Sequence, residues 1–139
     1  MSAKDTYHNQ VISALKKDNW QITHDPLIIE LSSGRQLRVD LGAENLIAAD
    51  KQLDRIAVEI KSFLAPSTVS EFHTALGQFL NYRVALRVKE PERVLFLAVP
   101  KDIYDNFFFE EIAQLSVQEY QVKLLIFDPD LEEIGRAHV

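Results

Sequence analysis

Apolar and polar positions follow two different periods along this chain, and the changes of period mark the expected elements. Residues 3–18 carry apolar side chains at helical spacing, which predicts a first helix. Extended segments follow, several with the two-residue period of a strand, at 20–23, 27–31, 36–41, 46–49 and 55–63. Turn residues separate them, at Asp25-Pro26, Ser32-Ser33-Gly34 and 50–54.

The second half of the chain begins with a long predicted helix that reaches about residue 90, where Pro91 ends it. Ser67 or Ser70 would cap its start, with Glu71 placed to complete the cap. Apolar runs at 94–99 and 122–127 predict buried strands, separated by one or two short helices over 103–119 and followed by a polar tail. The order predicts one α/β domain over residues 1–139, with an antiparallel meander, a helical crossover and hence a mixed sheet.

Composition narrows the class of protein. The chain has 139 residues, of which 47% are hydrophobic and 26% charged, as in an ordinary soluble domain. It has no cysteine, which excludes disulfides and thiolate metal sites. No segment resembles a signal peptide or is long enough to span a bilayer, so we expect a cytoplasmic protein without membrane contact.

The most unusual segment is the apolar run 57–63, which carries a charged pair. Glu59 and Lys61 point to the same side of a strand, and folding the hairpin back places Asp40 opposite Glu59. Two such carboxylates suit Mg²⁺ or Mn²⁺, with Lys61 beside a reacting phosphate. The alternative interpretation is a salt bridge at a sheet edge.

The long helix adds a second pair of polar side chains. Gln78 and Tyr82 are four residues apart and share a face, next to Gly77, a residue that would allow a close backbone approach. A half-buried aromatic residue and a solvated amide would explain the same pair without a site.

Together, Asp40, Glu59-x-Lys61 and Gln78-x-x-x-Tyr82 resemble the PD-(D/E)xK nuclease superfamily, and in particular its RecB-like branch with a Gln-x-x-x-Tyr helix. The resemblance implies a restriction-endonuclease-like αβββαβ core. It implies that Asp40 and Glu59 are metal ligands, that Lys61 is catalytic, and that Gln78 and Tyr82 support the substrate or the site.

The resemblance suggests one further metal ligand, and the chain departs from the superfamily's pattern at one position. A histidine or acid on the first helix often completes such a site, for which His8 is the candidate metal ligand, ahead of Asp5 and Asp18. The proline that often precedes the aspartate of that superfamily is replaced here by Val39.

A closer resemblance covers nearly the whole chain. The opening Trp20-Gln21-Ile22-Thr23-His24-Asp25-Pro26 and the runs at 40–44, 57–63 and 70–82 resemble the XisH family, the fdxN-element excision controlling factors of cyanobacteria. The resemblance implies a factor needed for programmed excision of a DNA element by a site-specific recombinase, acting with a second controlling protein, XisI. The alternative is a non-catalytic interaction protein that keeps the nuclease fold and pairs with XisI.

The net charge of the chain affects whether it can bind DNA. The net charge of −6 is opposite to that of strong non-specific DNA binders, so DNA binding requires a local basic edge, an oligomer or a partner. Arg83, Arg87 and Lys89 would form such an edge, or simply a solvated helix end. The run 107–109, three phenylalanines, predicts core packing together with a contact between copies of the chain in a homo-oligomer.

Overall fold

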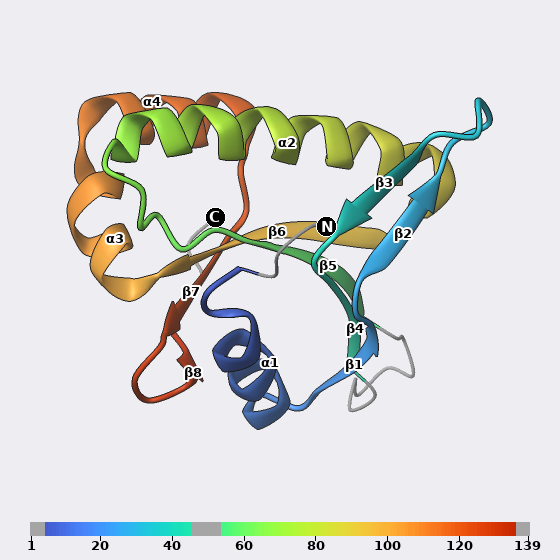
Figure 1. Ribbon diagram of the computed structural model, residues 1–139, viewed down its shortest axis with the longest axis horizontal. Coiled ribbons are helices and arrows are strands. Elements are labelled where there is room, and N and C mark those ends of the chain that lie inside the picture. The colour runs from blue at the N-terminus through green and yellow to red at the C-terminus, as the bar shows by residue number, and fades with distance from the viewer. Residues whose placement is uncertain (1–4, 46–53, 136–139) are drawn as a thin grey trace.

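A mixed six-stranded sheet organises the molecule in the computed structural model, which describes residues 5–45 and 54–135 (Figure 1). In spatial order its strands are β1 (Trp20–His24), β4 (Leu41–Asn45), β5 (Asp54–Ile60), β6 (Arg93–Pro100), β7 (Leu124–Asp128) and β8 (Glu133–Ile134). Neighbours are antiparallel except for β5, β6 and β7, which run parallel to one another. The predicted α/β class with a mixed sheet is therefore confirmed.

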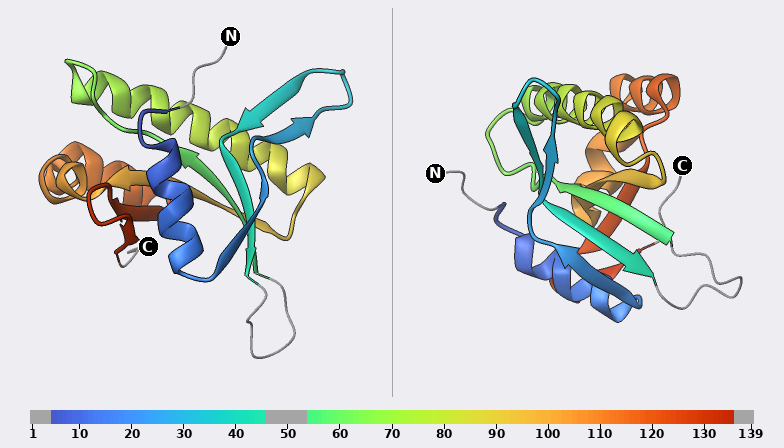
Figure 2. Two further views of the ribbon diagram at one scale, coloured as in Figure 1. Left: turned by 60° about the horizontal axis from the view of Figure 1, so that its bottom comes forward. Right: turned by 90° about the vertical axis from the view of Figure 1, so that its right-hand side faces the viewer.

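Helices cover both faces of this sheet (Figure 2). Helix α1 (His8–Lys17) lies on one face, while α2 (Thr68–Lys89) and α4 (Glu111–Tyr120) lie on the other. A short helix α3 (Lys101–Asn106) and a 3₁₀ turn η1 (Phe107–Phe109) lead from β6 into α4. None of the described helices is long and apolar enough to cross a membrane.

Strand β5 lies between two hydrophobic cores. Because side chains alternate along a strand, Ala57 contributes to the core beneath α2, whereas Val58 and Ile60 contribute to the core beneath α1. Glu59 shares a face with Ala57. The alternation therefore directs the acid of the Glu59-x-Lys61 pair to the face that α2 covers.

The predicted long helix is present as α2, and the structure shows which residue caps its N-terminus. Ser67 Oγ accepts a hydrogen bond from the backbone N–H of Ser70 at 3.2 Å, so Ser67 is the capping residue. Glu71 does not complete a capping box, because its carboxylate accepts from the backbone N–H of Ala65 at 2.7 Å. Phe72 and Phe79 fix the orientation of α2 by burial in the core.

The single strand expected over 36–41 is wrong. Strand β3 (Gln36–Val39) pairs with β2 (Leu27–Glu30) in a separate hairpin, and β4 begins at Leu41 in the main sheet. Asp40 is the bend between them. Val39 is buried in the core under α2 and Leu41 in the core under α1, although alternation alone placed them on one face. Apolar and polar residues keep alternating through this bend, so the sequence pattern does not reveal that the chain passes from one core to the other.

Smaller differences occur at the ends of elements. The first helix begins at His8 rather than near residue 3, and the expected polar tail contains β8, which pairs with β7. The predicted segment 46–49 and most of the turn at 50–54 lie outside the described residues. In the phenylalanine run, Phe107 and Phe108 are buried as predicted, whereas Phe109 is exposed; the contact between copies stays a prediction.

Candidate active site

The bend at Asp40 brings two carboxyl groups together. The backbone N–H of Ile60 donates to Asp40 Oδ2 at 2.7 Å, and the backbone N–H of Asp40 donates to Glu59 Oε1 at 3.3 Å. The β4–β5 ladder pairs Leu41 with Val58, so Asp40 lies opposite Glu59, as expected. At this end of the β4–β5 pairing, the two backbone N–H groups donate to carboxylate oxygens and not to backbone carbonyls. These hydrogen bonds hold the two acids in fixed positions.

Lys61 completes the charged group. Its Nζ lies 3.8 Å from Glu59 Oε2, and its backbone N–H donates to the carbonyl of Ala98 at 3.0 Å, which continues the β5–β6 pairing. Glu59 is only 5% exposed, whereas the side chain of Lys61 is 21% exposed. The lysine therefore reaches from the buried acid towards solvent.

Burial of two acids so close together perturbs their ionisation. Burial, followed by the negative charge of Asp40, raises the pKa of Glu59 to about 8, although the positive charge of Lys61 opposes both effects. Burial also raises the pKa of Asp40, against the stabilising hydrogen bond from Ile60. The interaction between the two carboxyl groups raises the pKa of Glu59 and opposes the rise in the pKa of Asp40.

Both predicted residues of α2 face this group. Gln78 and Tyr82 line a cleft of about 550 Å³ together with Asp40, Glu59 and Lys61. Burial raises the pKa of the Tyr82 phenol, and the charges of Glu59 and Asp40, which line the same cleft, raise it further. The side-chain oxygen of Gln78 is buried and has no hydrogen-bond partner among the described residues.

Packing within the described residues does not explain Gly77. A Cβ atom built there would meet no described atom within 4 Å outside the backbone of its own helix, so no neighbouring segment of the chain requires a glycine. The glycine has no packing reason in the described part of the chain.

The first helix supplies His8, which lines the same cleft and is buried at 4% exposure. Its Nε2 lies 2.8 Å from Asp25 Oδ1, while its buried Nδ1 has no partner among the described residues. Sequence reasoning interpreted Asp25 only as part of a turn, so this pair was missed. Asp5, the weaker candidate, also lines the cleft and accepts hydrogen bonds from the backbone N–H and the hydroxyl of Ser62. Asp18 ends α1 and is not among the cleft residues.

Arg38 is a further cleft residue that sequence reasoning did not select. It is exposed and lies on β3, two residues before Asp40. The signal was present, because the alternation along this segment places Arg38 and Asp40 on one face. An exposed guanidinium at the rim of an acidic cleft is suited to contact a phosphate.

The donor set fits a hard divalent cation in part. Asp40 and Glu59 offer two adjacent carboxylates whose like charges a cation would neutralise, and Mg²⁺ commonly uses one or two carboxylates and completes its shell with water. In the described part of the chain, no group of three or more His, Cys, Asp or Glu is placed to hold one metal ion. His8 as a ligand therefore stays a prediction that this arrangement does not support, since its Nε2 is engaged by Asp25.

A comparison with known protein families decides the family. The family model described as XisH protein matches residues 1–135. The chain belongs to the XisH family. The resemblance noted in the sequence is thereby confirmed.

Two solved XisH-type structures are similar to this chain along nearly its whole length. A XisH family protein from Nostoc punctiforme PCC 73102 is 48% identical, with 97% of this chain and 100% of that chain covered and a TM-score of 0.87. A fdxN element excision controlling factor protein from Anabaena variabilis is 49% identical, with 96% and 98% covered and a TM-score of 0.87. Among curated proteins, none matches this XisH chain.

Proposed function

We propose that this XisH-family chain is a controlling factor for programmed excision of a DNA element of the fdxN type, built on a metal-dependent DNA endonuclease-like scaffold. It would act with a site-specific recombinase and a XisI-type partner in the cytoplasm. The family and the similarity to the Anabaena variabilis controlling factor support the excision role. The convergence of Asp40, Glu59 and Lys61 at the end of β5 is the observation that supports the nuclease scaffold.

In this proposal the residues of the cleft take the roles that phosphodiester hydrolysis requires. Mg²⁺ or Mn²⁺, held by Asp40 and Glu59, would stabilise charge on the phosphate and lower the pKa of a water molecule. Lys61, 3.8 Å from Glu59 and partly exposed, would orient the nucleophile or hold a non-bridging phosphate oxygen. Gln78 and Tyr82 would donate hydrogen bonds to the DNA backbone from the wall that α2 forms.

Because the chain is acidic, it would need a partner with positive charge to bind DNA. A duplex is attracted mainly by phosphate neutralisation, and a net charge of −6 works against it. A XisI-type partner would supply the missing positive surface. Measuring DNA affinity with and without this partner tests the point, because equal affinity in both conditions contradicts a partner-supplied surface.

A non-catalytic regulatory role is the second candidate, and one observation favours it. Lys61 Nζ lies 3.8 Å from Glu59 Oε2, within ion-pair distance, as in a purely structural cluster of charges. In that case the nuclease-like cleft is a scaffold that pairs with XisI and regulates the recombinase without cutting DNA.

Cleavage of linear, supercoiled and branched DNA with Mg²⁺ or Mn²⁺, with and without XisI, separates the two candidates. We expect metal-dependent cutting by the wild type and none by Lys61→Ala, because the variant removes the ammonium group, 3.8 Å from Glu59, that would orient the nucleophile. Lys16→Ala, at an exposed position of α1, is the matched control and should cut normally. Absence of cutting under every condition would reject the enzyme and favour the regulatory scaffold.

A further inference from the structure

Three cations gather on the other side of α2. Arg83, Arg87 and Lys123 line a hollow of about 220 Å³ between the second half of α2, the start of β6 and the residues just before β7. No acidic side chain lines this hollow in the described part of the chain. In a protein with more acids than bases, 21 against 15, such a group is a local exception.

None of these three cations has a carboxylate partner among residues 5–45 and 54–135. Arg83 Nη1 donates to the carbonyl oxygens of Tyr120 and Gln121 at 2.7 and 3.1 Å, which orients its guanidinium without neutralising it. Arg87 and Lys123 make no side-chain hydrogen bond or ion pair within the described residues. Arg93, also at the hollow, differs because it is paired with Glu90 at 2.9 Å.

The cations are close enough to affect one another. Burial lowers the pKa of the Arg83 guanidinium, and the charge of Arg87 lowers it further. Lys89, expected to extend the same basic edge, instead donates to Ser32 Oγ on the hairpin turn at 3.3 Å. The cationic group is thus a compact one, and a bound anion would relieve its mutual repulsion.

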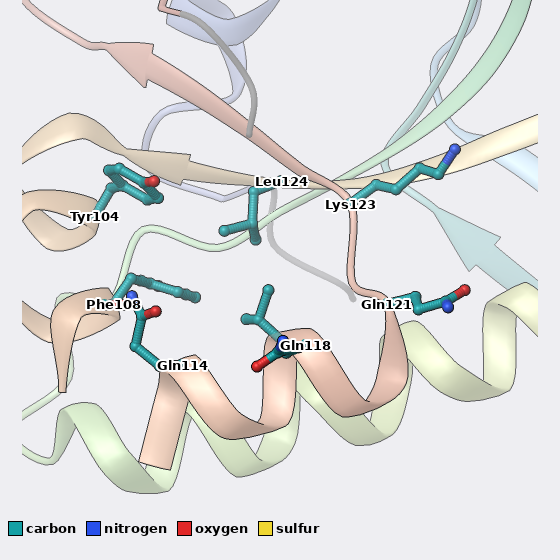
Figure 3. A pocket seen from close by; sticks show the side chains of 8 residues that line it. Tyr104, Phe108, Gln114, Gln118, Gln121, Lys123 and Leu124 are labelled. Atoms are coloured by element: carbon teal, nitrogen blue, oxygen red, sulfur yellow. Dashed lines mark hydrogen bonds between the residues drawn. The ribbon is translucent and has the colours of Figure 1, made fainter. Parts of the chain in front are cut away.

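A second hollow adjoins the first, because Gln121 and Lys123 line both. It measures about 560 Å³, within the usual range for small-ligand pockets, roughly 300–1,000 Å³. Figure 3 shows Tyr104 and Phe108 at one end and Gln121 and Lys123 at the other. The two rings lie nearly parallel, at 22° and with centroids 6.2 Å apart.

The walls of this second hollow combine apolar and amide groups. Phe108 and Leu124 are buried at 2% exposure and provide an apolar floor. Gln114 and Gln118, one helical turn apart on α4, line one side (Figure 3). Gln114 Nε2 donates to the carbonyl of Phe108 at 2.6 Å, so the amide of Gln118 is the one offered to a ligand. Aromatic and apolar surface for a flat ring, with an amide for its edge, is the chemistry that recognises a nucleobase.

We propose that the two hollows form one binding site for a nucleotide unit, with the phosphate among Arg83, Arg87 and Lys123 and the base between Tyr104, Phe108 and Gln118. The unit is either a free nucleotide or one nucleotide of a single strand. The site goes beyond the proposed function and is separate from the candidate cleft, which Gln78 and Tyr82 line from the same helix.

Calorimetric titration in EDTA, with the full chain, tests the phosphate half. The probes are 5′-dAMP, deoxyadenosine, inorganic phosphate and an oligo(dA) of about twelve nucleotides. We expect Arg87→Gln and Lys123→Gln each to weaken 5′-dAMP binding about tenfold, since each removes one charge-assisted contact. Arg35→Gln and Lys16→Gln, which remove the same charges from exposed positions elsewhere, should leave it unchanged.

A second variant tests the base half. Gln118→Leu keeps the size of an exposed side chain and removes its amide, so it should weaken 5′-dAMP several-fold and leave inorganic phosphate unchanged. If only the oligonucleotide binds, with the same losses, the unit belongs to a strand and the site stands. The nucleotide assignment is overturned if inorganic phosphate binds with the same affinity as 5′-dAMP and Gln118→Leu weakens neither.

The remaining outcomes concern the whole proposal. No binding of any probe, or equal losses in the two control variants, overturns it. Lys61→Ala should retain full 5′-dAMP affinity, because Lys61 lines the other cleft. This result keeps the nucleotide site distinguishable from the nuclease proposal, which a loss of DNA cleavage in the same variant would test.

Discussion

Glu59 should make the stability of the protein depend strongly on pH. Its pKa is 4.5 in the unfolded chain and about 8 in the folded protein, raised by burial and by Asp40. Between these values the folded state holds a proton that the unfolded state has released, so the contribution of Glu59 to stability is fully present below pH 4.5 and is lost as pH rises through about 8. The full shift corresponds to roughly 5 kcal/mol, and relaxation and entry of water reduce the effect to about 2–4 kcal/mol.

Glu59→Gln isolates this contribution. The amide keeps the acceptor for the backbone N–H of Asp40 and cannot ionise. We expect the wild type to lose about 2–4 kcal/mol of unfolding free energy between about pH 5 and about pH 9, and the variant to lose much less. The variant should therefore be the more stable protein at the alkaline end.

Urea unfolding followed by circular dichroism, in EDTA, provides the measurement, with the slope m compared to verify that the unfolded states match. Glu119→Gln, at an exposed position of α4, is the control and should follow the wild type at every pH. Parallel pH curves for the wild type and Glu59→Gln would refute the argument, because they would mean that burial beside Asp40 does not perturb this acid.

Two further outcomes follow from the site and the core. Mg²⁺ or Mn²⁺ should stabilise the wild type above neutral pH, by about 2.7 kcal/mol when the cation is at a hundred times its Kd. In thermal unfolding, Asp40→Asn should lose this gain. Equal gains in the two proteins would exclude Asp40 as a ligand. Phe79→Ala, at 0% exposure, should cost about 3–5 kcal/mol in urea unfolding, whereas Val88→Ala, at 72% exposure on the same helix, should stay within about 0.5 kcal/mol; similar costs would contradict the placement of α2.

Much of the candidate site was predictable because it depends on local periodicity. Glu59 and Lys61 share a face through the two-residue period of β5, and Gln78 and Tyr82 share one through the helical period of α2. The two pairs meet because the crossover from β5 to β6 places α2 over that face. The family resemblance supplied the expectation that they belong together.

The bend at Asp40 was not predictable in the same way. Regular alternation continued through it, and the break depends on Val39 and Leu41 packing into different cores. The His8–Asp25 pair likewise joins two segments whose local patterns indicate only a helix and a turn. Such contacts depend on how distant elements pack, which no local period encodes.

The sequence by itself determined the kind and order of the elements, the charged pair of β5 and the polar face of α2, because each depends on residues a few positions apart. Only the tertiary structure decided that Asp40 turns its carboxylate to Ile60, that Glu59 is buried enough to raise its pKa to about 8, and that Lys123 joins Arg83 and Arg87. Burial and charge clustering arise from long-range packing, since the same residues would be solvated and well separated in an unfolded chain.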